Sequence, residues 1–362
     1  MPEAVRLVGS FALSLGAAAL LVPLVIRLAL RTGFMDLPAG YKGHMRATPY
    51  LGGVAVVAAG TIAILAFGDA TSRYGSLLIW ALVLFVLGTV DDKRNLSPVP
   101  RLLIEIVAGA ALWNYGLGFT EFGSTALNIL VTIVWVVGVV NAFNLMDNMD
   151  GAAASVAGVS ALGVAALCII GGDVTLAVIV LAAAGACAGF LPHNLSSPSR
   201  IFLGDGGSMP LGLVVAGAVM AAPMSENLGL AGMFGAALIV GLPILDTTLV
   251  VISRRRGGRP ILSGGRDHLT HRLRVLLGSP RMVALALATA QAGLCITGVL
   301  LTQAPTASVV VVGIAYLGAA CSVLYTLESR IRVTAVNSGS GPIGVVSVPS
   351  RASALAADEL AA

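Results

Sequence analysis

The sequence predicts an all-α integral membrane protein, a polytopic bundle of about 11 transmembrane helices. Hydrophobic residues make up 57% of the 362 residues and charged residues only 10%, whereas a soluble domain carries about a quarter charged residues. The mean hydropathy is +0.96. Charges, glycines and prolines divide the chain into apolar runs, each long enough to cross a hydrocarbon core of about 30 Å as a helix. No separate basic block suggests a nucleic-acid partner.

The apolar runs follow one another through short connections, and their ends are defined to within about four residues. The predicted spans are 7–30, 51–67, 76–90, 102–117, 125–141, 152–170, 175–191, 209–223, 229–252, 282–302 and 308–327. Residues 1–330 are expected to form one transmembrane domain. Residues 331–362, rich in Ser, Gly, Ala and Val, are expected to form a disordered cytoplasmic tail.

Basic residues give the orientation of the bundle. Of the 21 Lys and Arg residues, all except Arg6 and Arg73 fall on the side of the odd-numbered connections and the C-terminus. Cytoplasmic loops are enriched in basic residues, so this side is expected to be cytoplasmic and the N-terminus to lie outside. All four histidines and the acids that end the apolar runs fall on the same side. The active site is therefore predicted at the cytoplasmic face.

The most informative acids are Asp91 and Asp92, which end an apolar run that begins at Ser76. Two like charges at a membrane boundary are costly unless a divalent cation and bound phosphates offset them. Beside Lys93 and Arg94, such a pair can hold Mg²⁺ and phosphate oxygens, and either acid can act as a general base. A solvated loop cap is the alternative. The pair favours phosphate chemistry assisted by a hard metal ion.

A second motif alternates amides and acids between the fifth and sixth spans. Its members are Asn141, Asn144, Asp147, Asn148 and Asp150. Their spacing places Asn144, Asp147 and Asn148 near one helix face, where they can bind a metal ion, sugar hydroxyls or a nucleotide. The alternative for Asp150 is an N-cap of the sixth span.

A third motif, Gly204-Asp205-Gly206-Gly207-Ser208, surrounds a lone acid with glycines. Glycines permit close backbone approach, and the free N–H groups at the start of the following span suit an anion. A plain turn with an N-cap is the alternative.

The longest connection, 253–281, is basic and contains two histidines. Its arginines, Arg259 and Arg266 among them, suit pyrophosphate recognition, whereas positive-inside topology and lipid headgroups explain Arg254 to Arg256. His268 and His271 lie in this polar loop, and a histidine there is a catalytic candidate.

Three features outside these motifs are open to two interpretations. Lys42 and His44 form either a substrate clamp or a plain membrane-edge loop. Glu105 and Asp246 fall inside apolar segments, where an acid suggests function. A structural link to an arginine is the alternative for Asp246.

The order of the motifs resembles the polyprenyl-phosphate N-acetylhexosamine-1-phosphate transferases, glycosyltransferases that make lipid-linked sugars for cell-wall biogenesis. The resemblance covers residues 35–275. It rests on Asp91-Asp92 with Asn-Leu-Ser, Asn141-x-x-Asn144-x-x-Asp147-x-x-Asp150-Gly, Gly204-Asp205-x-Gly-Ser and Asp267-His268-x-x-His271.

The resemblance implies transfer of a sugar-1-phosphate from a UDP-N-acetylhexosamine to a polyprenyl (undecaprenyl or decaprenyl) phosphate, with release of UMP and a need for Mg²⁺ or Mn²⁺. It implies catalytic roles for Asp91, Asp92 and His268, and metal binding by Asp205 with Asp92. The residues that it assigns to substrates are Lys42, His44, Asn141, Asn144, Asp147, Asp150, Arg259, Arg266 and His271. It also implies a multi-pass protein of the bacterial inner (plasma) membrane that contacts membrane lipids, and a homodimer is possible.

Two branches of this family and two other classes of protein compete. The branch that uses UDP-N-acetylmuramoyl-pentapeptide in peptidoglycan synthesis usually has three consecutive histidines in the last loop, whereas this chain has His268-Leu-Thr270-His271. That pattern is similar to the branch that uses UDP-N-acetylglucosamine, although this branch often has His at Thr270 and Gly at Asn148. A polytopic transporter would place its acids near the midplane. A binding or scaffold protein would have lost some of the acids or His268.

Overall fold

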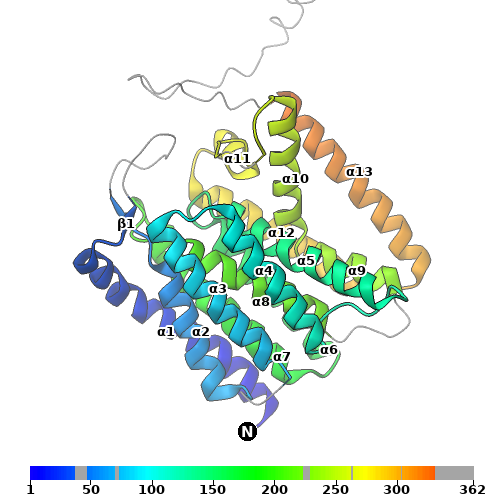
Figure 1. Ribbon diagram of the computed structural model, residues 1–362, viewed down its shortest axis with the longest axis horizontal. Helices are drawn as coiled ribbons and strands as arrows, with labels where there is room; N and C mark the ends of the chain where they lie inside the picture. The colour runs from blue at the N-terminus through cyan, green and yellow to red at the C-terminus, as the bar shows by residue number, and fades with distance from the viewer. Residues whose placement is uncertain (37–46, 70–72, 223–228, 262–263, 303, 331–362) are drawn as a thin grey trace, which may run out of the picture.

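The computed structural model describes residues 1–36, 47–69, 73–222, 229–261, 264–302 and 304–330, and these residues are mostly helical (Figure 1). The helices are α1 (Glu3–Thr32), α2 (Gly52–Phe67), α3 (Gly75–Arg94), α4 (Pro98–Asn114), α5 (Thr125–Met146), α6 (Ala152–Ile170), α7 (Val174–Asn194), α8 (Asp205–Ala221), α9 (Gly229–Leu238), α10 (Gly241–Arg256), α11 (Leu269–Leu277), α12 (Pro280–Leu301) and α13 (Thr306–Arg330). Strands β1 (Met35–Asp36) and β2 (Thr48–Pro49), which the sequence did not predict, pair in antiparallel fashion. Lys42, His44 and the predicted tail lie outside the described residues.

Seven of the described helices are long and apolar enough to cross a membrane, namely α1, α3, α5, α6, α7, α12 and α13. Two others, α2 and α8, are apolar but shorter. By length and composition the chain is therefore a multi-pass, all-α membrane protein, as the sequence predicts. Each predicted span coincides with one helix except 229–252.

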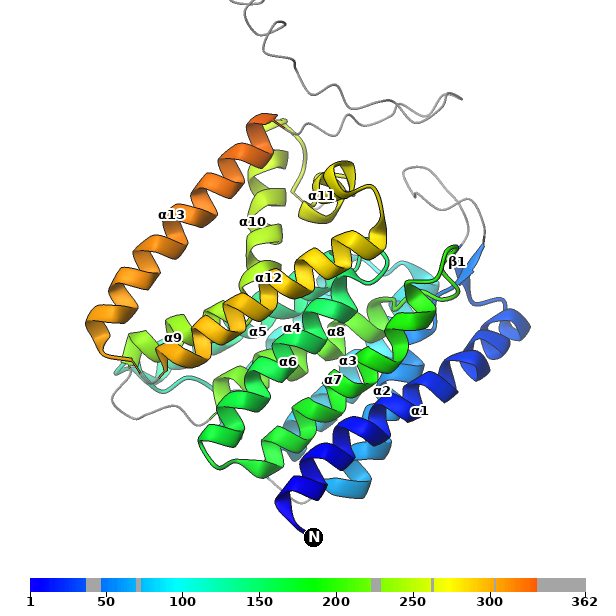
Figure 2. The same ribbon diagram turned by 180° about the vertical axis from the view of Figure 1, so that it is seen from behind.

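The main body of the protein is here taken as helices α1–α9 and α12. Small residues allow these helices to approach one another closely. On α7, a Cβ at Gly185 or at Gly189 would lie 2.2 Å from an atom of α1. Figure 2 shows α1 and α7 side by side. Lipid provides no hydrophobic drive between helices, so close packing at small residues holds them together.

The prediction of one helix over 229–252 is wrong, because the segment is broken between α9 and α10. Buried polar side chains satisfy the backbone groups that the break exposes. Gln291 of α12 donates to Ile239 O at 2.7 Å and accepts from Leu242 N at 3.2 Å. Ser160 of α6 also donates to Ile239 O, at 2.6 Å. A break at membrane depth is tolerated where such partners exist.

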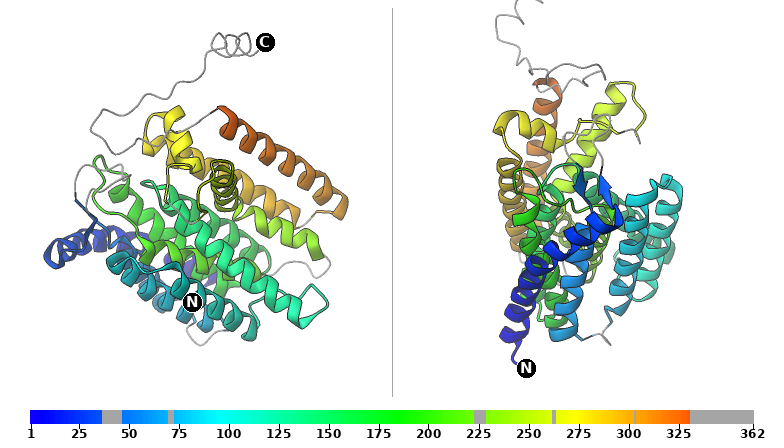
Figure 3. Two further views of the ribbon diagram at one scale, coloured as in Figure 1. Left: turned by 45° about the horizontal axis from the view of Figure 1, so that its top comes forward. Right: turned by 90° about the vertical axis from the view of Figure 1, so that its left-hand side faces the viewer.

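Because of the break, α10 points in a different direction from the helices of the body. Figures 2 and 3 show α10, α11 and α13 together on one side of the body, with α11 next to α10. Helix α10 thereby carries Asp246 and Arg254 toward the loop that precedes α11.

Candidate active site

The first pair of acids lies in the last turn of α3. The helix ends at Asn95, which has a positive φ of 47°. Asp91 is buried and accepts hydrogen bonds from Leu96 N at 2.6 Å and from Arg101 Nη1 at 2.5 Å. Both oxygens of Asp91 therefore hold the turn that leads into α4.

Asp92 holds the start of α8. Its Oδ1 accepts from Asp205 N at 2.9 Å and its Oδ2 from Gly206 N at 3.1 Å. A helix leaves its first N–H groups without internal partners, and a carboxylate there also complements the helix dipole. The turn at Gly204, which has a φ of +75°, thus brings Asp205 onto the acids of α3.

The contact between α3 and this turn depends on Gly88. A Cβ at Gly88 would lie 2.3 Å from the carbonyl oxygen of Asp205. We therefore expect Gly88→Ala to displace the turn, to lower the thermal midpoint and to reduce turnover by about tenfold or more. The matched control is Gly138→Ala on α5, where no atom beyond the adjoining backbone of α5 lies within 4 Å of the added Cβ. Equal effects of the two substitutions would contradict this account.

Asp91, Asp92 and Asp205 lie together and are called the carboxylate cluster below. Two residues of the second motif, on and just after α5, join it. Asn144 Nδ2 donates to Asp205 Oδ1 at 2.7 Å and to Ser208 Oγ at 3.2 Å. Asp147, just beyond the end of α5, accepts from Gly204 N at 3.0 Å. Motifs separated by more than fifty residues in the sequence therefore meet around one turn.

Two other residues of that motif have different surroundings. Asn141 donates to Glu105 and to Val137 O, so it faces α4 rather than the turn. The intramembrane acid Glu105 is therefore paired with an amide. Asp150 lies near Asn194, with Oδ1 3.5 Å from Nδ2.

Arg101 is the site residue that sequence reasoning missed, because it counted only as a basic residue of a cytoplasmic loop. Its Nη1 contacts Asp91 at 2.5 Å and Asp205 at 3.0 Å. Its position at the start of a span, on the face that carries the acids, was the only signal in the sequence.

The electrostatics of the cluster suit a cation. Burial, followed by the negative charge of Asp205, raises the pKa of Asp147 to about 8, against the hydrogen bond from Gly204 N. Among the described residues, no three side chains of ligand type lie close enough together to hold a metal ion as they stand. The donors are nevertheless all oxygens and mutually repulsive, which is the chemistry that a hard divalent cation relieves. The donor chemistry therefore fits Mg²⁺, although the described residues form no ready-made site.

The basic loop is organised around Asp267. Arg254 Nε and Arg259 Nη2 donate to its Oδ2 at 2.9 and 3.0 Å. Although burial opposes the change, these hydrogen bonds and charges lower the pKa of Asp267. Arg254 is 3% exposed, so the predicted contact of Arg254 with lipid headgroups is wrong.

The histidine motif starts α11 and packs against α10 and the loop after α5. His268 is buried, with Nδ1 2.9 Å from Asp246 Oδ2. The suggested arginine partner for Asp246 is therefore wrong. Two residues on, Thr270 donates to Asn148 Oδ1. Asn148 thus anchors α11 instead of sharing a helix face with Asn144 and Asp147.

His271 gives a pH prediction. Burial, with nearby positive groups such as Arg266, lowers its pKa to about 4. The unfolded state, in which a histidine titrates near 6.5, binds more protons between pH 6.5 and 4. The stability that His271 contributes is therefore complete above pH 6.5 and is lost as the pH falls toward 4. We expect the thermal midpoint of His271→Gln to fall less between pH 7 and pH 5 than that of the wild type, and identical slopes would contradict this.

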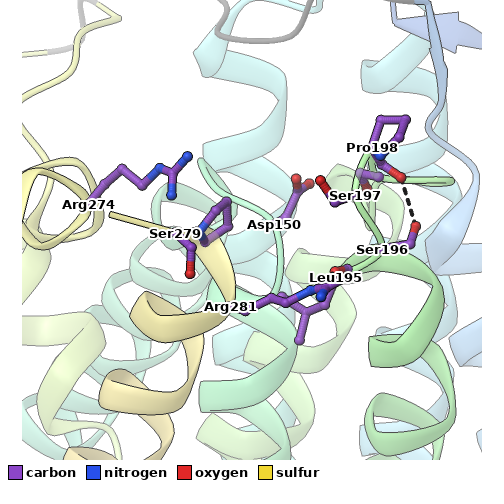
Figure 4. Close-up of a pocket in the computed structure, with 10 residues that line it drawn as sticks. Asp150, Leu195, Ser196, Ser197, Pro198, Arg274, Ser279 and Arg281 are labelled. Carbon is purple, nitrogen blue, oxygen red and sulfur yellow. Dashed lines mark hydrogen bonds between the residues drawn. The ribbon is translucent and has the colours of Figure 1, made fainter. Parts of the chain in front are cut away.

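A cavity of about 330 Å³ adjoins the second motif. Figure 4 shows Asp150 between Ser279 and Ser197, with Arg274 on the side of α11 and with Arg281 reaching from α12 toward Leu195. Arg281 Nε donates to Leu195 O at 2.7 Å. The cavity thus offers cations and hydroxyls beside an acid.

Comparison with known proteins places this chain in a family. The model of glycosyl transferase family 4 matches residues 74–222. A Bacillus subtilis protein, named a probable undecaprenyl-phosphate N-acetylglucosaminyl 1-phosphate transferase, is 30% identical over 293 residues, which cover 78% of this chain and 81% of that protein. The chain belongs to glycosyl transferase family 4.

Two mycobacterial proteins are similar to this chain at comparable levels. The Mycolicibacterium smegmatis and Mycobacterium tuberculosis proteins, both named decaprenyl-phosphate N-acetylglucosaminephosphotransferase, are 30% and 31% identical. They cover 68% and 71% of this chain and 70% and 73% of their own lengths. The family match begins at the residue before α3 and ends just after α8, so it contains every carboxylate of the cluster.

Proposed function

We propose that this protein transfers N-acetylglucosamine-1-phosphate from UDP-N-acetylglucosamine to a polyprenyl phosphate and releases UMP. The single observation that carries the proposal is the meeting of Asp92, Asp147, Asp205 and Arg101 around the Gly204 turn, at the ends of apolar helices. The names of the relatives support the sugar and the lipid acceptor. A lipid phosphate in the bilayer and a soluble nucleotide sugar can meet only at such an interface.

In the proposed mechanism, an oxygen of the polyprenyl phosphate attacks the β-phosphorus of the donor, and the bond to the α-phosphate breaks so that UMP leaves. Such a reaction depends on positioning and on stabilising the charge that develops on phosphate oxygens. Among the described residues, Arg101 donates only through Nη1. Its Nη2 is therefore available to donate hydrogen bonds to a phosphate. Asp91 holds Arg101 in place, and either Asp91 or Asp92 positions or deprotonates the acceptor.

A divalent cation, Mg²⁺ or Mn²⁺, completes the proposal. Asp205 and Asp92 would hold it, with Asp147 nearby. When bound, such a cation neutralises the diphosphate and polarises the bond to UMP. The repulsion between the carboxylates of the cluster supports this assignment.

The nucleotide is assigned to the cavity beside Asp150. Arg274 and Arg281 supply positive charge there, and the 195–199 loop supplies hydroxyls. Arg259, Arg266 and His271 belong to the adjoining basic loop, which we propose covers the diphosphate. With the basic face inside, the whole site would lie at the cytoplasmic side of the plasma membrane.

The experiment that tests this function is UMP release from purified protein in detergent. UDP-N-acetylglucosamine, UDP-N-acetylgalactosamine and UDP-N-acetylmuramoyl-pentapeptide would be offered in parallel, with and without polyprenyl phosphate and Mg²⁺. We expect UMP release that needs both lipid and cation and is fastest with UDP-N-acetylglucosamine. Preference for the pentapeptide donor would move the chain to the peptidoglycan branch, and no release from folded protein would contradict the proposed function.

A further inference from the structure

One carboxylate outside the cluster has contacts that the reaction described above does not explain. Asp246 lies on α10 and is fully buried. Its Oδ2 lies 2.9 Å from His268 Nδ1, and its Oδ1 accepts from Leu269 N at 2.6 Å. A buried carboxylate is costly unless both oxygens are satisfied, and here both partners come from the start of α11.

One of these hydrogen bonds holds the first turn of α11, and the other holds the imidazole ring of His268. Leu269 is the first residue of α11, with His268 as its N-cap, so the bond to Leu269 N satisfies a helix N–H that would otherwise have no partner. The bond to Nδ1 fixes the imidazole itself. An ionised carboxylate only accepts hydrogen bonds, so it requires the proton of a neutral His268 to lie on Nδ1.

The second ring nitrogen of His268 is left without a partner in the part of the chain that the structure describes. Within the described residues, Nε2 of His268 makes no hydrogen bond, and it is not among the fully enclosed unpartnered atoms. Asp267, the acid that precedes His268 in the sequence, is paired with Arg254 and Arg259. Asp246 is therefore the carboxylate that determines which nitrogen of His268 carries the proton.

The start of α11 is bonded to the loop after α5, which also carries Asp147. Thr270 is fully buried and bonded to Asn148, the residue next to Asp147. The ring of His271 lies 6.2 Å from that of His268. Asp246 from α10 and Asn148 from the loop after α5 thus fix both sides of the first turn of α11.

We propose that Asp246 is a positioning residue, which through His268 Nδ1 and Leu269 N holds the imidazole in the tautomer that leaves Nε2 as an acceptor toward the bound substrates. The role in turnover rests on the proposed function, whereas the tautomer does not. Asparagine has nearly the same shape, but its amide group has one acceptor oxygen and one donor nitrogen. In Asp246→Asn, the oxygen can keep Leu269 N–H, and the nitrogen then donates to Nδ1 and moves the ring proton to Nε2.

The first test is the tautomer, read from ¹⁵N-histidine NMR spectra of the full-length protein in detergent. The chain has only four histidines, and the signal that disappears in His268→Gln belongs to His268. We expect the proton of the neutral ring on Nδ1 in the wild type and on Nε2 in Asp246→Asn. A wild-type proton on Nε2, or a tautomer unchanged by Asp246→Asn, would overturn the proposal, and the first result needs no variant at Asp246.

The second test is a double-mutant cycle measured by UMP release. We expect Asp246→Asn to lower turnover by about 10- to 100-fold, the range seen when a residue that orients another is lost. In a His268→Ala background the same substitution should cost less than about twofold, because its effect passes through His268. A full additional loss in that background would show a separate structural role and overturn the proposal.

The matched control is Thr248→Val, two residues along α10 on its exposed face, where Oγ1 donates only to Ile244 O. It should leave turnover and the NMR signal of His268 unchanged. If the wild type releases no UMP with any donor, the proposed function fails, and the tautomer still decides whether Asp246 fixes His268.

Discussion

Asp205→Asn is expected to lower kcat/KM by about 100-fold or more while the protein still folds and inserts. Asp205 accepts from Arg101 through Oδ2 and from Asn144 through Oδ1. The asparagine side chain keeps the shape of Asp205 but removes the charge that would bind a divalent cation. Its NH₂ group is a donor and would face Arg101 or Asn144, which are themselves donors. UMP release measured against Mg²⁺ concentration checks the result.

The control for this substitution is Glu121→Gln. Glu121 is exposed in the loop between α4 and α5, at the ends of those helices away from the cluster. Its loss should leave turnover unchanged. Turnover close to wild type in Asp205→Asn, at any Mg²⁺ concentration, would refute the cation role of Asp205.

Arg101→Met is the second substitution with a large expected effect. It removes the guanidinium that bridges Asp91 and Asp205 and leaves Asp91, which is 5% exposed, without its charged partner. We expect turnover to fall by about 100-fold and the free energy of unfolding to fall by about 2 kcal/mol. Thermal midpoints and UMP release, measured on the same preparation, report the two effects.

A double variant separates the two effects of Arg101. Asp91→Asn in the Arg101→Met background removes the uncompensated charge, so the thermal midpoint should recover while turnover stays low. Recovery of turnover together with stability would show that Arg101 serves only to balance Asp91. No recovery of either would contradict the assigned ion pair.

The sequence predicted the helical positions well because the membrane restricts what a spanning segment can be. Apolar runs of sufficient length coincide with helices throughout the described chain, since hydrocarbon leaves backbone groups no partner except within the helix. The break between α9 and α10 was missed because its partners, Gln291 and Ser160, are about fifty or more residues away in the sequence. Gly241 and Pro243, just after Ile239, are the local signal against one continuous helix, but the distant side chains that make the break tolerable cannot be identified from the local sequence.

For the site, too, the general location of the acids was predictable from the sequence, whereas their individual partners were not. Motif order brought Asp92, Asp147 and Asp205 to one interface, because each follows or precedes a span at the same face. Individual partners were not predictable. Arg101 was counted only as a topology signal. For Asp246 an arginine link was one of two interpretations, and its partner is His268. The pairing of Asp246 with His268 depends on the direction that α10 takes, and that direction follows from the unpredicted break.

The most direct test of the central claim is to determine which bond of the donor breaks. UDP-N-acetylglucosamine labelled with ³²P at the α- or at the β-phosphorus would be incubated with the protein, polyprenyl phosphate and Mg²⁺, and then extracted with organic solvent. Sugar-1-phosphate transfer at the carboxylate cluster predicts that the β-label enters the lipid fraction while the α-label stays in the aqueous phase as UMP. Both labels remaining together in aqueous UDP, or no transfer by folded protein, would contradict it.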